Sequence, residues 1–463
     1  MPGAIAFHAN LHRAREVQEE VLLCILRRDP AFASIRSVRE FQERVPVRTY
    51  DEYGDITPPT PITHYETTSG SSGASKRIPY TRELRAEMNR AIAPWIVDLF
   101  RAQPGAFAGE AYWSVSPVLG TPASPPAEQG ASRSRPPAAG RRLLSRRDAG
   151  APSDEDHLGP VRARLVRAVQ AVPRDVRFLR DVETFRRVTL DYLLRCESLS
   201  LISVWHPSFL LLLLGGIREN PWPKLRVISC WSDANAARDA AELARIFPGV
   251  HIQPKGLLST EGFVSIPLAD DAHALAYRSH FYELRDVETN RVLPATEGEP
   301  GRRYAVVLTT GAGLYRYDTE DLVEIAGYRE ACPLLRFVGR ERHISDHYGE
   351  KLNELFVRER LDHVLRELPV RFAMLACEER AYTLFIECDA LPADVAPRLD
   401  ARLRENVHYD YCRRLGQLDE LRVLRVVDGA ATYLANAGPR LGDVKLTSLD
   451  ARTGWAARFR SAG

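Results

Sequence analysis

Hydrophobic residues recur every three or four positions along several stretches of the chain, a spacing that places side chains on one face of a helix. This spacing predicts helices over residues 11–29, 37–44, 83–102 and 182–217. Short runs rich in branched and aromatic residues predict strands over 225–229, 280–284 and 304–308. Helices and strands mixed in this way indicate an α/β core.

The pattern changes near residue 344, where a second and smaller unit is expected. Its predicted elements are a helix, two strands, a helix and a strand, over residues 353–367, 371–376, 382–388, 396–407 and 421–427. This order is typical of a small α+β domain. A chain of 463 residues is also too long for a single core. We therefore expect an N-terminal domain over 1–340 and a mobile C-terminal domain over 341–463, joined by a hinge at 337–344.

One segment, residues 121–150, follows neither pattern. It is rich in Pro, Ala, Ser and Arg and shows no hydrophobic period. Because such a composition cannot bury a core, we expect the segment to be disordered or to form a surface loop.

Composition narrows the class of protein. Hydrophobic residues make up 45% of the chain and charged residues 27%, which is ordinary for a soluble globular protein. The net charge of +2 gives no reason to expect a nucleic acid or an anionic membrane as partner. The longest apolar run, 209–214, is far shorter than the roughly 20 residues of a membrane-spanning helix and predicts a buried helix instead. Seven scattered cysteines without a C-x-x-C pair, and an N-terminus without a signal peptide, predict a reducing, cytoplasmic location.

A loop of short residues at 68–76 carries the strongest chemical signal. Its glycines accept positive φ angles, and consecutive backbone N–H groups in such a loop form an anion-binding nest. The hydroxyl groups add donors and the lysine adds a positive charge, so a polyphosphate is the natural ligand. The residues that would contact it are Ser69, Gly70, Ser71, Ser72, Gly73 and Lys76. A flexible Gly/Ser linker is the alternative, because the spacing is not that of a Walker loop.

Two acidic residues in turn-like segments suggest contacts to a nucleotide. Glu261 follows Ser259 and Thr260 and precedes a glycine, which suits a Mg²⁺ ligand beside a triphosphate. Asp321 precedes an apolar strand at 322–325, where a carboxylate is placed to accept both hydroxyls of a ribose. Taken alone, either residue is more often part of an ordinary exposed turn.

Taken in order, five blocks of the sequence resemble the auxin-responsive acyl-acid amido synthetase (Gretchen Hagen) family, particularly its bacterial members. The blocks are 68–76, 258–262, 315–321, 337–354 and 438–445. The family belongs to the acyl-adenylate-forming superfamily, and the similarity extends over about residues 35–450. Each block alone is weak evidence, whereas five blocks in the same order are strong evidence.

The resemblance implies roles for residues beyond the glycine-rich loop. The implied ATP-binding residues are Ser259, Thr260, Asp321 and Arg340, with Asp321 on the ribose, and Glu261 is the implied Mg²⁺ ligand. Two lysines have implied catalytic roles. Lys351 falls where the family has a phosphate-contacting lysine, and Lys445 falls where a lysine contacts the α-phosphate during adenylation.

Three departures from the family pattern are visible. Glu320 replaces the glycine that is usual before the ribose aspartate, and Arg342 stands where much of the superfamily has a hinge aspartate. Residues 119–150 do not resemble the family, and the resemblance resumes at 154–159. In the family this region helps to line the acyl pocket, so an insertion there bears on acid binding.

The implied fold is a large N-terminal acyl-adenylate-forming α/β domain followed by a small α+β domain, and the implied function is a two-step ligase that uses ATP and Mg²⁺. A carboxylic acid attacks the α-phosphorus of ATP, which gives an acyl-adenylate and pyrophosphate. An amino group, expected to belong to an amino acid, then attacks the acyl carbon to give an amide and AMP. Two alternatives remain: a ligase with a thiol acceptor such as coenzyme A, and a nucleotide-binding protein that has lost catalysis. The expected partners are small molecules, with no nucleic acid and no membrane, and we expect a monomer.

Overall fold

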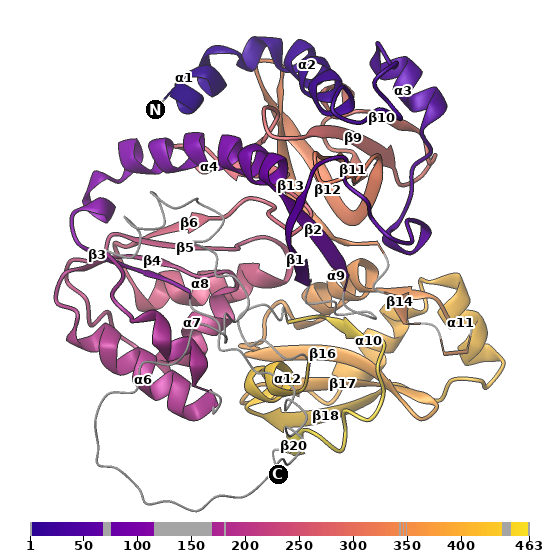
Figure 1. Cartoon of the computed structure of the whole chain (residues 1–463). Helices are drawn as coiled ribbons and strands as arrows, with labels where there is room; N and C mark the ends of the chain where they lie inside the picture. The colour runs from indigo at the N-terminus through magenta and orange to yellow at the C-terminus, as the bar shows by residue number, and fades with distance from the viewer. Residues whose placement is uncertain are drawn as a thin grey trace, which may run out of the picture.

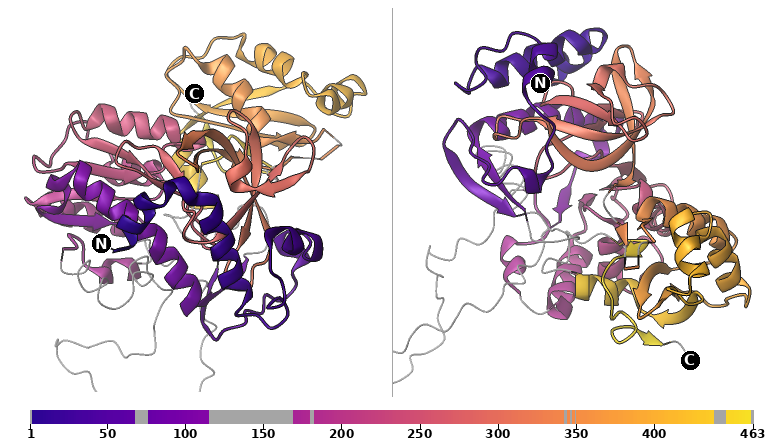
Figure 2. Two further views of the ribbon diagram at one scale, coloured as in Figure 1. Left: turned by 90° about the horizontal axis from the view of Figure 1, so that it is seen from above. Right: turned by 90° about the vertical axis from the view of Figure 1, so that its right-hand side faces the viewer.

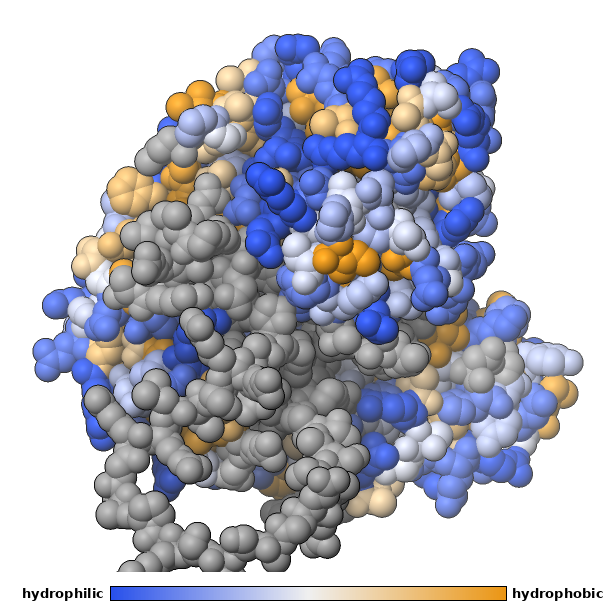
Figure 3. Space-filling model, viewed as in Figure 1, coloured by the Kyte–Doolittle hydropathy of each residue, from blue (hydrophilic) through white to orange (hydrophobic). Residues whose placement is uncertain are grey.

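The computed structural model describes residues 2–67, 76–114, 169–179, 182–341, 344–345, 347–348, 350–437 and 446–461. The segment 121–150 lies outside these residues. A four-stranded, a seven-stranded and a five-stranded sheet organise the described chain, and helices pack on them (Figure 1). None of the described helices is long and apolar enough to cross a membrane. In the view of Figure 3 the described surface is mostly hydrophilic, with apolar residues in small separate areas.

Four parallel strands form the central sheet of the N-terminal part. In spatial order they are β3 (Glu110–Trp113), β4 (Leu199–Ser203), β5 (Val227–Cys230) and β6 (His251–Pro254). Helix α4 (Arg82–Ala102) covers one face, where Trp95 Nε1 donates to Gln253 Oε1 at 3.1 Å (Figure 1). The other face is covered by α6 (Val182–Arg195), α7 (Pro207–Leu214) and α8 (Ala237–Ile246). The predicted buried helix at 209–214 is confirmed as part of α7.

The prediction of one helix over 182–217 is wrong in its middle, because β4 lies between α6 and α7. Every residue of β4 is buried. Helices cover both faces of this parallel sheet, so the strand lacks the alternation of apolar and polar residues that marks a half-exposed strand. A short apolar run of this kind cannot be distinguished from a helix by its period alone.

The seven-stranded sheet is antiparallel throughout. In spatial order its strands are β10 (Val292–Pro294), β9 (Phe281–Asp286), β11 (Arg303–Thr309), β12 (Tyr317–Arg329), β13 (Cys332–Arg340), β8 (His273–Leu275) and β7 (Ser265–Pro267). The largest hydrophobic core lies between this sheet and the helices α1 (Pro2–Ala9), α2 (Ala14–Leu26) and α4. Helix α3 (Val38–Arg44) and the hairpin of β1 (Ile62–Thr67) and β2 (Arg77–Thr81) complete this part. The predicted helices at 11–29, 37–44 and 83–102 and the three predicted strands are all present.

Strand β12 begins at Tyr317, so Asp321 lies inside a strand and not ahead of one as predicted. The pairing of β12 with β11 shifts register between Ala305 and Val307, which leaves extra residues of β12 in a bulge. Glu320 lies in this bulge with a φ of 64°, a conformation that glycine adopts without penalty. The backbone here therefore has the shape that a glycine favours, although a glutamate occupies the position.

The C-terminal part of the chain forms a separate lobe in all three views (Figures 1 and 2). A small ladder of β14 (Ile344–Ser345) and β15 (Leu352–Asn353) precedes its sheet, whose strands in spatial order are β19 (Leu449–Asp450), β16 (Phe372–Glu378), β17 (Ala381–Glu387), β18 (Arg422–Val427) and β20 (Arg460–Ser461). Helices α9 (Glu354–Leu365), α10 (Val395–Leu403) and α11 (Val407–Arg414) share one core with this sheet, and α12 (Gly429–Ala437) shares another. The predicted elements are present, except that the helix at 396–407 ends at Leu403. The boundary at residue 340 and the mobility of this lobe stay predictions.

Candidate functional site

A tight turn at residues 259–262 places Glu261 inside the protein. Ser259 N–H donates to the Gly262 carbonyl at 3.1 Å, which reverses the chain. The hydroxyl of Thr260 donates to Glu261 Oε2 at 3.0 Å. The residue Glu261 is only 4% exposed, so the alternative of an ordinary exposed turn is wrong.

The Glu261 carboxylate meets a tyrosine and a lysine from distant segments. Tyr317 OH donates to Glu261 Oε1 at 3.3 Å and accepts from Lys76 Nζ at 2.8 Å. Lys76 Nζ also lies 4.0 Å from the same carboxylate oxygen. Burial and the Glu261 charge raise the pKa of Tyr317 above its usual range, so the phenol stays protonated and keeps donating. Because Lys76 ends the predicted phosphate loop at 68–76, the structure places the end of that loop beside Glu261.

Asp321 and Arg340 form an ion pair across β12 and β13. They lie directly opposite each other in the strand register, and Arg340 Nε donates to Asp321 Oδ1 at 2.7 Å. Asp321 is 3% exposed. Its charge raises the pKa of Arg340, and Glu261 and Tyr317 add to this effect. The ion pair therefore lies within electrostatic reach of the Glu261 carboxylate.

These five residues, Lys76, Glu261, Tyr317, Asp321 and Arg340, form what we call the charged cluster. Two cations and two carboxylates from a loop end, a turn and two strands meet there. Within the described ranges, no three His, Cys, Asp or Glu side chains group together as a metal cage. Mg²⁺ does not need such a cage, since it is commonly held by one or two carboxylates together with phosphate oxygens and water. The single buried carboxylate of Glu261 fits that donor set.

Tyr317 is the member of the charged cluster that sequence reasoning missed. It belongs to the block 315–321, but an isolated tyrosine carries no signal that separates a core residue from a functional one. Its two hydrogen bonds become visible only when the turn at 259–262 and the end of the loop at 68–76 are brought together.

A buried Glu–His pair holds the turn in place. The side chains of Glu87 and His280 are fully buried. His280 Nε2 accepts from Phe263 N–H at 3.3 Å, and its Nδ1 lies 3.0 Å from Glu87 Oε2, which also accepts from Gly311 N–H at 2.9 Å. Since Nε2 accepts, the ring carries its proton on Nδ1 and is neutral. A Cβ on Gly262 would lie 2.9 Å from His280 Nε2, so the turn can approach the histidine this closely only with glycine.

Lys351 lies apart from the charged cluster. Its side chain is exposed and its backbone φ is 45°. The preceding Glu350 is fully buried and accepts from the N–H groups of His347 and Tyr348, at 2.9 and 2.7 Å, and from Tyr382 OH at 2.5 Å. This buried carboxylate shapes the loop that presents Lys351 on the surface of the C-terminal lobe. Its contact to phosphate stays a prediction.

Six predicted site residues lie outside the described chain: Ser69, Gly70, Ser71, Ser72, Gly73 and Lys445. Ser259 and Thr260 are described and lie beside Glu261 in the turn. Their contacts to ATP, like those of the six, stay predictions.

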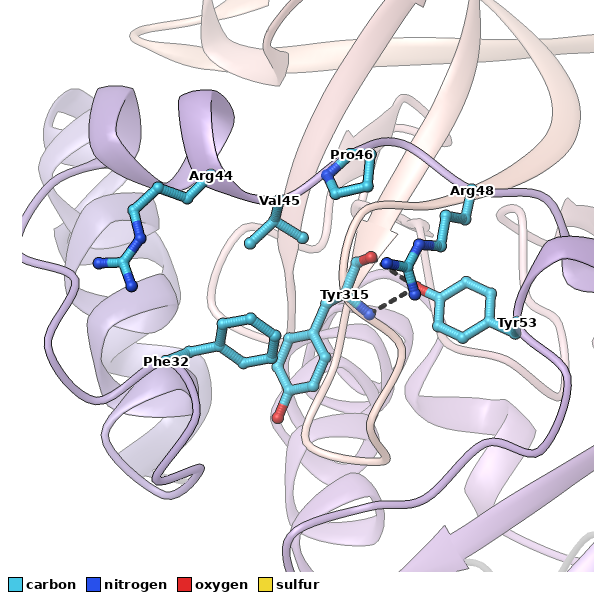
Figure 4. A pocket seen from close by; sticks show the side chains of 7 residues that line it. All are labelled: Phe32, Arg44, Val45, Pro46, Arg48, Tyr53 and Tyr315. Carbon is cyan, nitrogen blue, oxygen red and sulfur yellow. Dashed lines mark hydrogen bonds between the residues drawn. The ribbon is translucent and has the colours of Figure 1, made fainter.

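A small pocket lies beside Tyr315, just before β12 (Figure 4). It is lined by Phe32, Arg44, Val45, Pro46, Arg48, Tyr53 and Tyr315. Its volume of about 90 Å³ is well below the roughly 300–1,000 Å³ of ordinary ligand pockets. Figure 4 shows the Tyr53 hydroxyl bonded to the Tyr315 backbone, and Asp318 N–H donates to the Arg48 carbonyl at 2.8 Å. The pocket marks the place where the N-terminal segment anchors the start of β12, and we assign no ligand to it.

Comparison with solved structures shows the fold. The AtGH3.15 acyl acid amido synthetase in complex with 2,4-DB superposes with a TM-score of 0.75 at 17% identity, covering 99% of this chain and 96% of that one. A 2-hydroxyisobutyryl-CoA ligase in the postadenylation state superposes with a TM-score of 0.51 at 13% identity, covering 96% of this chain and 88% of that one. The chain therefore has the fold of the acyl-adenylate-forming enzymes.

Comparison of sequences finds two matching family models. The model of the GH3 family N-terminal domain matches residues 5–117, and that of the GH3 family central domain matches residues 273–340. Both models are domains of the GH3 family, which confirms the resemblance found in the five blocks.

Named relatives match over shorter stretches. The probable indole-3-acetic acid-amido synthetase GH3.6 of Oryza sativa subsp. japonica is 29% identical over 170 residues, which is 32% of this chain and 33% of that protein. The probable indole-3-acetic acid-amido synthetase GH3.12 of the same plant is 42% identical over 86 residues, 19% of this chain and 14% of that protein. The matched part of the chain thus spans a third or less of the length of these two relatives.

We expect His280→Ala to destabilise the protein by about 2–4 kcal/mol, because it leaves the Phe263 N–H without a partner and removes one of the donors to the buried Glu87 carboxylate. His280→Gln should lower the free energy of unfolding by about half as much, since an amide side chain can donate to Glu87 and accept from Phe263 N–H. Denaturant unfolding measures both losses.

The control is His251→Ala, which removes a half-exposed partner of Asp271 and should cost less than about 1 kcal/mol. Equal losses in His280→Ala and His251→Ala would show that the Glu–His pair does not hold the turn.

Proposed function

We propose that this chain activates a carboxylic acid with ATP and transfers the acyl group to an amine, which gives an amide, AMP and pyrophosphate. The proposed acceptor is the amino group of an amino acid. The observation that carries the proposal is the charged cluster, in which residues from four separate motifs meet at one place. The matches to two GH3 family models and the adenylate-forming fold support the same function.

In the proposed first step, the charged cluster binds and orients ATP. Asp321 accepts the ribose hydroxyls, and Arg340 holds this carboxylate in place through their hydrogen bond. Lys76 and the loop at 68–76 hold the phosphates. Mg²⁺ held by Glu261 would offset negative charge on the phosphate oxygens. A substrate carboxylate oxygen attacks the α-phosphorus, pyrophosphate leaves, and nearby positive charges stabilise the pentavalent transition state.

In the proposed second step, an amine attacks the acyl carbon and AMP leaves. The C-terminal lobe carries Lys351 and Lys445, so a rotation about the hinge at 337–344 would exchange which lysine faces the α-phosphate. We assign Lys445 to adenylation and Lys351 to phosphate contact, as the family resemblance implies.

The substrates are small molecules in this proposal. The relatives that match are named indole-3-acetic acid-amido synthetases, and the AtGH3.15 structure contains 2,4-DB. These names support a small organic acid as the acyl donor. We also propose a monomer in the cytoplasm, without nucleic acid or membrane as partner.

Product analysis separates this proposal from its two alternatives. The purified protein is incubated with ATP, Mg²⁺, a panel of small carboxylic acids, and either an amino acid mixture or coenzyme A, and products are identified by mass spectrometry. An amide with release of AMP and pyrophosphate supports the proposal. A thioester formed only with coenzyme A would show the thiol ligase, and ATP binding without any pyrophosphate release would show a binding protein.

Glu261→Gln keeps the shape of the side chain but removes its charge, so we expect adenylation to slow by at least about 100-fold and to require more Mg²⁺. Acid-dependent pyrophosphate release at increasing Mg²⁺ concentrations measures both effects. Glu288→Gln, at an exposed position, is the matched control. A Mg²⁺ dependence and a rate equal to wild type would remove Glu261 from the metal site.

Lys445→Ala tests the division of labour between the two steps. Its charge should matter when the pentavalent phosphorus forms and much less when the amine attacks. We therefore expect the variant to lose acid-dependent pyrophosphate exchange into ATP while amide formation from a supplied acyl-adenylate stays nearly intact. An equal loss in both half-reactions, in a folded variant, contradicts this assignment.

A further inference from the structure

Arg285 of β9 binds two acidic residues from other parts of the seven-stranded sheet, Asp318 in β12 and Glu341 directly after β13. Its Nε donates to Asp318 Oδ2 at 2.7 Å, its Nη2 donates to Glu341 Oε2, and its Nη1 donates to Asn290 Oδ1 at 3.1 Å. β11 lies between β9 and β12, and the β11 residue paired with Arg285 is Ala305, whose small side chain leaves room for the arginine to cross. The Arg285 side chain is 15% exposed and that of Asp318 is 5% exposed. One half-buried guanidinium therefore ties β9 to β12 and to the end of β13.

The same two acidic residues hold the backbone of Glu320. Asp318 Oδ1 accepts from Glu320 N–H at 2.9 Å, and Glu341 N–H donates to the Glu320 carbonyl at 2.9 Å. Glu320 is the residue of the β12 bulge with a φ of 64°, a conformation that is unfavourable for any residue with a Cβ and persists only where the surroundings hold it. The contacts from Arg285 through Asp318, Glu320 and Glu341 back to Arg285 form a closed ring, which we call the bulge ring.

The bulge ring directly adjoins the pair assigned to the ribose. Glu320 precedes Asp321 in β12, and Glu341 follows Arg340 at the end of β13. Asp321 and Arg340 lie opposite each other in the strand register and share a hydrogen bond of 2.7 Å. A shift of the bulge or of the end of β13 therefore moves one partner of this pair. Because one carboxylate must accept two hydroxyls at once, a small change in its position weakens the contact.

We infer that Arg285 is a positioning residue for the nucleotide: it holds the Asp321 carboxylate in the direction that accepts both ribose hydroxyls. The inference rests on the proposed function. Asp318 and Glu341 bind one guanidinium, so its removal leaves two carboxylates close together, one of them buried. Like charges without a shared cation move apart, and a buried carboxylate without its partner is costly. The bulge and the end of β13 then separate, and the Asp321 carboxylate turns away from the ribose.

The test compares wild type with the double variant Arg285→Met/Asp318→Asn. The second change removes the buried charge that the first would leave unpaired, and its amide oxygen can still accept from Glu320 N–H. Calorimetry measures the binding of ATP and of 2′,3′-dideoxy-ATP, each with Mg²⁺. Wild type should prefer ATP by about tenfold or more, because hydrogen bonds to a charged group are lost with the two hydroxyls, and the double variant should bind both nucleotides within about threefold of each other.

Two controls separate positioning from general support of the fold. Arg291→Met, at an exposed arginine between β9 and β10, should keep the wild-type preference for ATP. Asp321→Ala should lose the preference by itself, and adding Arg285→Met/Asp318→Asn to it should not change the ratio of the two affinities further, because Arg285 acts through Asp321.

A double variant that binds both nucleotides more weakly but keeps the wild-type preference would show that Arg285 only supports the fold, and would overturn the inference. A wild-type protein that binds ATP and 2′,3′-dideoxy-ATP equally would overturn it as well, since no ribose contact would be left to position. If the preference changes as expected but wild type releases no pyrophosphate with any acid, the proposed function fails and the positioning role of Arg285 stands.

Discussion

The burial of the Glu261 carboxylate is the constraint on which the rest of the site depends. A carboxylate removed from water must be hydrogen-bonded and paired with a positive charge, or its burial costs several kcal/mol. Thr260 and Tyr317 supply hydroxyl donors, and Lys76 supplies the charge. These groups come from the turn itself, from β12 and from the end of the glycine-rich loop. One buried charge therefore requires three distant segments to meet.

The turn at 259–262 and strand β12, which meet at Glu261, are held in place by different contacts. On one side the His280 ring accepts a hydrogen bond from Phe263 N–H at the end of the turn and is itself bonded to Glu87. Glu87 also accepts from Gly311 N–H in the loop before β12. On the other side a bulge in β12 lies between Tyr317 and Asp321, with Glu320 in a left-handed conformation. Unfavourable backbone conformations persist where the surrounding structure holds them, and they gather at functional sites.

Sequence reasoning reached the residues whose chemistry is visible in a short motif. Glu261 beside two hydroxyl residues, and Asp321 before an apolar run, were identified in this way. Strand β4 was missed because it is buried on both faces and shows no alternation. The pair of Glu87 and His280 was missed because its members lie 193 residues apart, and contacts of that kind follow from topology, which a hydrophobic period does not report.

Exchange of labelled pyrophosphate into ATP by the wild-type protein, with no amine present, tests the central claim most directly. The account predicts exchange that requires both Mg²⁺ and a carboxylic acid, because only a reversible acyl-adenylate returns pyrophosphate to ATP. Exchange that proceeds without any acid, or no exchange with any acid in a protein that binds ATP, would contradict it.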